Sequence, residues 1–307
     1  MSQILTATQL PSRRGFAMAL MVVSSVAISF GGLIVRNMDG SDAWQINFYR
    51  STGLVIAIAT ILVIQYRSNS VAQVRRIGRS GLLGGALLTV AGISFLQALT
   101  NTTVANTLFI LSAIPFITAA LAWLFLREHL QNATLVTMAA ASLGVCIMMV
   151  EGVGLGSSYG NTMALLTAFC FAGFAVIVRR NRQVDMLPTL LVSGMLILIL
   201  SLVARWGNLS ISTKDILLCL LWGGALSGFA NCLFIVASRH LVAAELTLFM
   251  LLEFALGPIW VWLFVNEVPT RWTIIGGMVV IASVTIRALY EMQRNGHKLK
   301  RGRPSPM

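Results

Sequence analysis

Residues 120–128 read Ala-Leu-Ala-Trp-Leu-Phe-Leu-Arg-Glu, and residues 259–267 read Ile-Trp-Val-Trp-Leu-Phe-Val-Asn-Glu. Both stretches are apolar almost to their ends, and both close on a glutamate. They share Trp-Leu-Phe and the final Glu at a spacing of 139 residues. An apolar segment that returns at this distance indicates that the chain is built from two related halves.

The composition indicates a membrane protein. Of the 307 residues, 57% are hydrophobic and only 10% are charged, whereas a soluble domain carries about 25% charged residues. Polar residues gather between apolar blocks of about 20 residues, the length of a helix that crosses a bilayer. The pattern predicts an all-α membrane protein with ten transmembrane helices, near 15–36, 43–66, 81–100, 103–126, 132–150, 161–179, 187–204, 216–237, 243–265 and 272–290.

The basic residues predict the orientation of these helices. With the N-terminus inside, the inner segments hold 17 lysines and arginines, and the outer segments hold four, namely Arg36, Arg205, Lys214 and Arg271. Cytoplasmic loops of membrane proteins carry the excess of basic residues, so both termini are expected in the cytoplasm. The net charge of +12 therefore reflects topology in a lipid bilayer, and no nucleic-acid partner is expected.

A second repeated motif connects the two halves. Residues 84–87 (Gly-Gly-Ala-Leu) return as residues 223–226, again 139 residues later. Because five is an odd number of crossings, a second five-helix unit starts on the opposite side of the membrane, which makes the repeat inverted. The predicted organisation is a cytoplasmic tail over 1–14, a first repeat over 15–150, a second repeat over 161–290 and a basic cytoplasmic tail over 291–307.

These residues resemble a known family of transporters. Pro115 with the stretch that ends at Glu128, the copy that ends at Glu267, and Arg50 early in the second span are similar to the EamA-type family of the drug/metabolite transporter superfamily. The resemblance covers nearly the whole chain. It implies a multi-pass carrier of the bacterial inner membrane that exports amino acids, related metabolites or drugs through a central cavity.

The sequence departs from the family at one place. The family often has a proline directly after the acid of the ninth span, but here Glu253 is followed by Phe254 and the proline is Pro258. A kink displaced by about one turn reshapes one wall of the cavity. The substrate therefore does not follow from the resemblance.

Two ionisable residues are expected inside the membrane, where a charge costs about 3 kcal/mol or more. Glu253 lies near the middle of its predicted span. It is a candidate partner for a substrate amine or a candidate proton carrier, and the alternative is a structural ion pair or a protonated, hydrogen-bonded carboxyl. Arg50 lies nearer the outer surface, where it could reach inward to a substrate, cap helix carbonyls or pair with Asp42.

Other acids and polar residues are weaker candidates. Glu245 is expected at the inner interface, and Glu128 and Glu267 are expected to cap backbone groups at helix ends. Five aromatic residues could offer surfaces to a cationic or ring-bearing substrate, but most lie near span ends and are expected to anchor the spans at the interface: Trp44, Tyr49, Trp222, Trp260 and Trp262. The polar residues that we expect around the cavity, or bonded between helices, are Tyr49, Gln97, Ser112, Ser227 and Asn231, together with Ser25, Ser29, Asn101 and Asn106. Asn231 breaks the repeat, because its counterpart in the first half is Gly92.

No enzyme, cofactor or metal site is predicted. The chain has no GxSxG, HExxH or P-loop motif, and its four cysteines lie inside apolar blocks without metal-ligand spacing. The driving force for transport is therefore expected from a proton or substrate gradient. The rival hypothesis is a polytopic receptor or assembly scaffold. A cavity lined by the first, third, fourth, sixth, eighth and ninth spans favours a carrier, whereas a solid core favours the rival.

Overall fold

The computed structural model describes residues 11–38, 40–102, 104–128, 131–148, 150, 157–266 and 270–301, with the backbone alone for 11–13, 36, 68, 71, 104, 105 and 291–301. Every secondary-structure element in these residues is a helix. In chain order they are α1 (Pro11–Ser29), α2 (Gly31–Arg36), α3 (Ala43–Tyr66), η1 (Arg67–Asn69), α4 (Ser70–Arg76), α5 (Gly78–Asn101), α6 (Val104–Leu111), α7 (Ile114–Leu126), α8 (Asn132–Met148), α9 (Ser158–Arg180), α10 (Leu187–Ala204), α11 (Thr213–Leu220), η2 (Leu221–Gly228), α12 (Phe229–Ser238), α13 (Ala243–Val265) and α14 (Arg271–Arg301).

The helices are long and apolar, as the sequence predicts. Within the described part of the chain, nine helical segments have the length and hydropathy of membrane spans. The apolar helix α8 is shorter, at 17 residues. Each of the ten predicted blocks falls on one of these segments. The chain is therefore a multi-pass, all-helical membrane protein.

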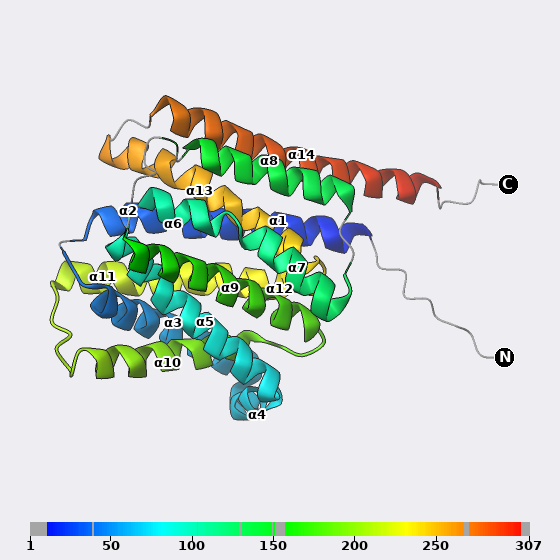
Figure 1. The fold of residues 1–307 in the computed structure, drawn as a ribbon. Helices are drawn as coiled ribbons and strands as arrows, with labels where there is room; N and C mark the ends of the chain where they lie inside the picture. Colours follow the sequence, from blue (N-terminus) through cyan, green and yellow to red (C-terminus); the bar gives the residue numbers. More distant parts are fainter. Residues whose placement is uncertain are drawn as a thin grey trace.

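The helices form one bundle and run back and forth between its two ends (Figure 1). The start of α1 and the end of α14 lie at the same end, which we call the terminal end. The opposite end, where α2, α10 and α13 finish, is called the far end. Helices α8 and α14 lie side by side along one edge of the bundle, and α3 and α10 lie together on the other side.

Three of the crossings depart from a continuous α-helix. The first is broken at Phe30 between α1 and α2, and the fourth is broken between α6 and α7, where α7 begins at Ile114 and Pro115. Pro115 is tolerated there because the first residues of a helix need no helical N–H donor. The eighth crossing contains η2, a π-helix over Leu221–Gly228. Such wide turns are rare and occur frequently at functional sites.

Glycines allow the closest helix contacts. A Cβ added to Gly223 of η2 would lie 1.7 Å from the Arg50 carbonyl oxygen of α3, so any side chain at this position would collide with backbone. A Cβ at Gly276 of α14 would likewise lie 2.3 Å from the Gly144 oxygen of α8. Small residues at both interfaces let the backbones approach each other, which is the usual way that helices associate in a membrane.

Candidate functional site

Two adjoining cavities lie within the bundle. The deep cavity has a volume of about 160 Å³, and the far cavity has a volume of about 530 Å³. The far cavity reaches the far end of the bundle, because the exposed residues Val35 and Thr270 line it. Five residues line both cavities, and we call them the neck: Ile28, Arg50, Phe95, Glu253 and Phe254. The neck therefore holds both of the ionisable residues that the sequence singled out.

The deep cavity is lined by more helices than predicted. The six expected spans contribute, with residues such as Ser25 of α1, Thr167 of α9 and Thr247 of α13. Helix α3 also contributes Ser51, and α10 contributes Ser193, so the second and seventh crossings form part of the wall. These residues were not predicted, because a serine inside an apolar block is equally consistent with a hydrogen bond between helices.

Glu253 lies on α13 and faces both cavities. Its Oε2 atom is buried and has no hydrogen-bond partner among the described residues. Pro258, which lies inside α13, has no N–H to donate to the carbonyl of Phe254, the residue four positions earlier. An unpartnered carboxyl oxygen and a backbone carbonyl that lacks its helical donor thus belong to consecutive residues of α13, both of which line the neck.

Arg50 lies on α3, and its guanidinium stacks on the ring of Trp222, with the Cζ atom 5.0 Å from the ring centroid. Trp222 belongs to η2 and is only 4% exposed, which corrects the expectation that it anchors the span at the interface. The expected alternative pairing with Asp42 is also not formed. Asp42 instead lies 3.6 Å from the Nε atom of Arg205 and caps the first turn of α3.

Three of the predicted polar residues line the deep cavity, namely Ser25, Ser227 and Asn231. Ser227 of η2 lines it, and its Oγ atom is buried without a hydrogen-bond partner in the described structure. Asn231 of α12 also lines it, but its Nδ2 donates to the Ser227 carbonyl at 2.8 Å. The amide oxygen of Asn231 therefore remains the group that could accept a hydrogen bond from a ligand.

Of the remaining predicted polar residues, Ser29 lines the far cavity, and five line neither cavity, namely Tyr49, Gln97, Asn101, Asn106 and Ser112. The Ser112 hydroxyl donates to the Phe109 carbonyl at 2.7 Å, at the break between α6 and α7. The side-chain oxygen of Gln97 accepts from Asn101 Nδ2 at 3.3 Å. The Tyr49 hydroxyl donates to the carbonyl of Leu209, in the loop after α10, at 3.0 Å. Their placement favours structural roles, because each bonds to a neighbouring helix turn or loop.

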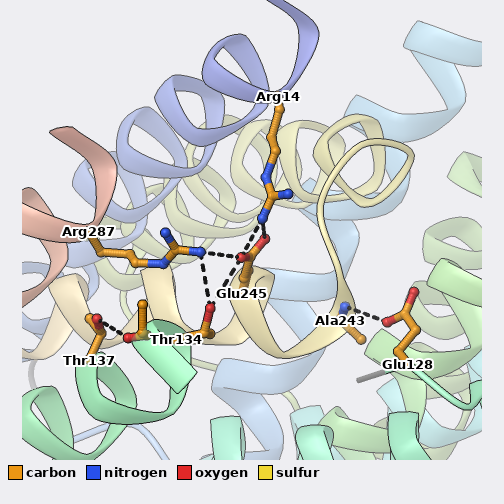
Figure 2. A network of polar contacts seen from close by, with 8 residues as sticks. Arg14, Glu128, Thr134, Thr137, Ala243, Glu245 and Arg287 are labelled. Carbon is orange, nitrogen blue, oxygen red and sulfur yellow. Dashed lines mark hydrogen bonds and ion pairs between the residues drawn. The ribbon is translucent and has the colours of Figure 1, made fainter. Parts of the chain in front are cut away.

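The terminal end is closed by a buried ionic cluster (Figure 2). Glu245 of α13 accepts hydrogen bonds from Arg14 of α1 at 2.6 Å and from Arg287 of α14 at 3.0 Å. Thr134 of α8 donates to the same carboxylate at 3.4 Å. Glu245 and Arg287 are each only 2% exposed. Glu245 lies in the first turn of α13, at the end of the span, but three other helices cover it.

A second ion pair lies beside this cluster. Glu128, at the end of α7, accepts from Arg179 Nε of α9 at 2.8 Å and from the backbone N–H of Ala243 at 3.4 Å. The second contact caps the start of α13, as predicted for this glutamate. Its predicted counterpart, Glu267, lies outside the described residues. Phe171 and Phe234 line the deep cavity and pack with each other and with Phe174, with ring centroids 5.8–6.0 Å apart.

The neck has the features of a ligand-binding site. In the described part of the chain, no group of three His, Cys, Asp or Glu residues could hold a metal ion. The neck offers one cation, one carboxyl group and three apolar side chains to a ligand that enters from the far end. Such a combination of apolar walls and a few convergent polar groups is typical of a small-molecule site.

Comparisons with known proteins point in the same direction. The EamA-like transporter family matches the chain over residues 15–150 and 158–288. The chain is similar to solute carrier family 35 member G1 of Mus musculus, with 26% identity over 295 residues, which cover 88% of this chain and 77% of the mouse protein. It also superposes on a crystal structure described only as that of a protein, with a TM-score of 0.74 and 13% identity, over 90% of this chain and 98% of the other. At that identity the structural match shows a common fold alone.

Proposed function

Since the chain belongs to the EamA-like transporter family, as its motifs suggested, we propose that this membrane transporter is a secondary exporter of amino acids or related small metabolites and drugs. The proposal rests above all on the neck, where Arg50 and Glu253 face two adjoining cavities near the middle of the bundle. A receptor or scaffold needs no such cavity. The mechanism that we propose is alternating access, in which the neck opens to one end of the bundle at a time.

The contacts between helices support two inverted five-helix halves. The exchange of the two halves makes α1 equivalent to α9, α3 to α10, α5 to the crossing of η2 and α12, and α7 to α13. Helix α1 contacts α13 and α12, and its equivalent α9 contacts α7 and α5. Likewise α3 contacts η2, and its equivalent α10 contacts α5. The pairs α3 with α10 and α8 with α14, which this exchange maps onto themselves, are also in contact. Helices α7 and α13 even end alike, because Arg127 and Asn266, 139 positions apart, have φ angles of 53° and 57°. In this proposal, α8 and α14 are the fifth and tenth spans.

The distribution of basic residues supports a cytoplasmic location for both termini, in the inner membrane of a bacterium. The far cavity would then face outward, and the buried ion pairs of Glu245 and Glu128 would close the cytoplasmic end. Opening that end requires α7, α9 and α13 to move apart, which separates Glu128 from Arg179. The packed small residues of η2 and α3 would let these helices rock against each other.

Glu253 is the residue that we assign to substrate or proton coupling. It is the acid of the neck, and no acid stands at the equivalent positions of the first half, Ala113 and Ile114. Apolar surroundings disfavour the ionised form of a carboxyl group, whereas water or an amine in contact with it stabilises that form. The protonation of Glu253 would thus change with the conformation of the transporter, which links binding to the switch.

The test compares Glu253→Gln with wild type in proteoliposomes loaded with candidate solutes, after a resistance screen with toxic amino acids, amines and dyes has identified one. We expect the variant to insert and to remain stable in detergent but to transport poorly, with a residual rate that depends less on pH. Asp42→Asn, at an exposed ion pair outside both cavities, serves as the control and should transport normally. Wild-type rates and pH profile in Glu253→Gln would refute the assigned role.

A further inference from the structure

The neck contains a basic and an acidic side chain that do not meet. Arg50 on α3 and Glu253 on α13 line the same two cavities, yet no ion pair or hydrogen bond joins them. Between them the neck is apolar, with Ile28, Phe95 and Phe254. A buried charge that has no counter-charge is unfavourable unless a ligand or water completes it. The separation therefore leaves room for a molecule that carries both complementary charges.

The guanidinium of Arg50 is held without a carboxylate. Among the described residues, no hydrogen bond or ion pair holds its side chain, and its Cζ atom lies over the ring of Trp222, 5.0 Å from the centroid. The acids nearest in sequence and position are occupied, since Asp42 pairs with Arg205 and Asp215 accepts from the Ser41 hydroxyl at 2.7 Å. Stacking on an aromatic face orients the planar guanidinium and leaves its edge, with its N–H donors, free to bind an anion.

Gly92 provides the space that the guanidinium occupies. A Cβ added to Gly92 of α5 would lie 3.5 Å from Arg50 Nη2 and 3.2 Å from Ile197 Cδ1. Any side chain larger than a methyl group would therefore displace the end of Arg50. In the second half the equivalent position is Asn231, which lines the cavity with its amide. The glycine in the first half thus allows an arginine to reach the neck from α3.

We propose that the neck is a zwitterion subsite, in which Arg50 binds the carboxylate of the substrate while Glu253 and the Phe254 carbonyl bind its ammonium group. The inference rests on the proposed transport function and narrows its substrate class to small solutes that carry both charges. A single guanidinium matches one negative charge, and the nearby carboxyl of Glu253 disfavours a phosphate group, which carries about −1.5 to −2. Trp222 and Gly92 position Arg50, through the ring under the guanidinium and the space beside it.

Binding can be measured without transport, as the thermal shift of the purified protein in detergent. The probes are matched sets: neutral α-amino acids from glycine to phenylalanine, the corresponding amino-acid amides, which lack the carboxylate, and the corresponding acids, which lack the ammonium group. We expect at least one amino acid to stabilise the wild type more than its amide and its deaminated acid. The proposal fails if no amino acid stabilises the protein, or if the amide stabilises it equally.

The variants separate the two charges of the subsite. In Arg50→Gln we expect affinity for the amino acid to fall about tenfold or more, because a charge-assisted hydrogen bond is lost, while affinity for the amide is kept. Arg50→Lys keeps the positive charge but not the paired N–H donors of the guanidinium, so its loss of affinity for the amino acid should be intermediate. This variant also replaces Arg50→Gln in the comparison if Arg50→Gln does not fold. Gly92→Leu should mimic Arg50→Gln without a change of charge. Arg205→Gln, outside both cavities, is the control and should bind as wild type.

The same measurements distinguish this inference from the proposed function. If the wild type transports an amino acid and Arg50→Gln transports it with an unchanged KM, the subsite is overturned and the transport function stands. Binding that depends on Arg50 in a protein that transports no amino acid would support the subsite and overturn the transport function. Equal thermal shifts of wild type and Arg50→Gln with the amino acid would contradict the proposal directly.

Discussion

The buried cluster at Glu245 gives a quantitative prediction. The Glu245→Gln substitution keeps the size of the side chain but removes the negative charge between Arg14 and Arg287, whose Nη2 atoms lie 2.6 and 3.0 Å from Oε1. The side chains of Glu245 and Arg287 are only 3% and 2% exposed. Removal of one partner from such a pair leaves an uncompensated buried charge and costs roughly 3–5 kcal/mol.

Two further ion pairs form a graded comparison. At Glu128 and Arg179 the side chains are 19% and 10% exposed, so Glu128→Gln should destabilise less than Glu245→Gln. At Asp42 and Arg205 they are 42% and 38% exposed, and water screens the pair. Breaking such an exposed pair costs about 0–1 kcal/mol. The expected order of destabilisation is therefore Glu245→Gln, then Glu128→Gln, then Asp42→Asn.

The assay is the apparent melting temperature of each purified variant in one detergent at one scan rate, because membrane proteins often unfold irreversibly. A loss of about 3–5 kcal/mol is a large part of the total stability of a typical protein, about 5–15 kcal/mol. Glu245→Gln should therefore melt well below wild type, and Asp42→Asn close to it. The double variant Glu245→Leu with Arg287→Leu should lose less than the sum of its two single variants, because the charges depend on each other. Equal melting temperatures across the three single variants would refute the reasoning from burial.

The remaining predictions concern packing and topology. Gly223→Ala should abolish the contact of η2 with α3 and lower the yield of folded protein, because its Cβ would lie 1.7 Å from the Arg50 carbonyl oxygen. Gly277→Ala, where the nearest atoms lie at 4.0 Å, should fold normally, and equal yields in a fluorescence-detected size-exclusion assay would contradict this view. A cysteine placed at Ser157 should react with a membrane-impermeant reagent from outside, and one at Ser70 only from inside. Reaction of both from the same side would exclude inverted halves.

The sequence was sufficient for the helical architecture, because a span needs about 20 apolar residues whatever its neighbours are. The motif around Glu128 identified the transporter family, and the cost of charge in a bilayer led to Arg50 and Glu253. Both residues line the neck. These inferences depend on local composition and spacing, which can be read from a single chain.

The tertiary structure decided which residues meet. Glu245 contacts Arg14 across 231 positions of sequence, and Trp222 lies under Arg50 because the glycine contact of η2 with α3 brings that turn close. Neither pairing follows from a hydropathy pattern. An apolar block fixes how long a helix is, whereas the small residues and crossing points between blocks fix which faces touch. For that reason Gln97, Ser112 and Tyr49 bond outside the two cavities, while serines of α3 and α10 line the deep one.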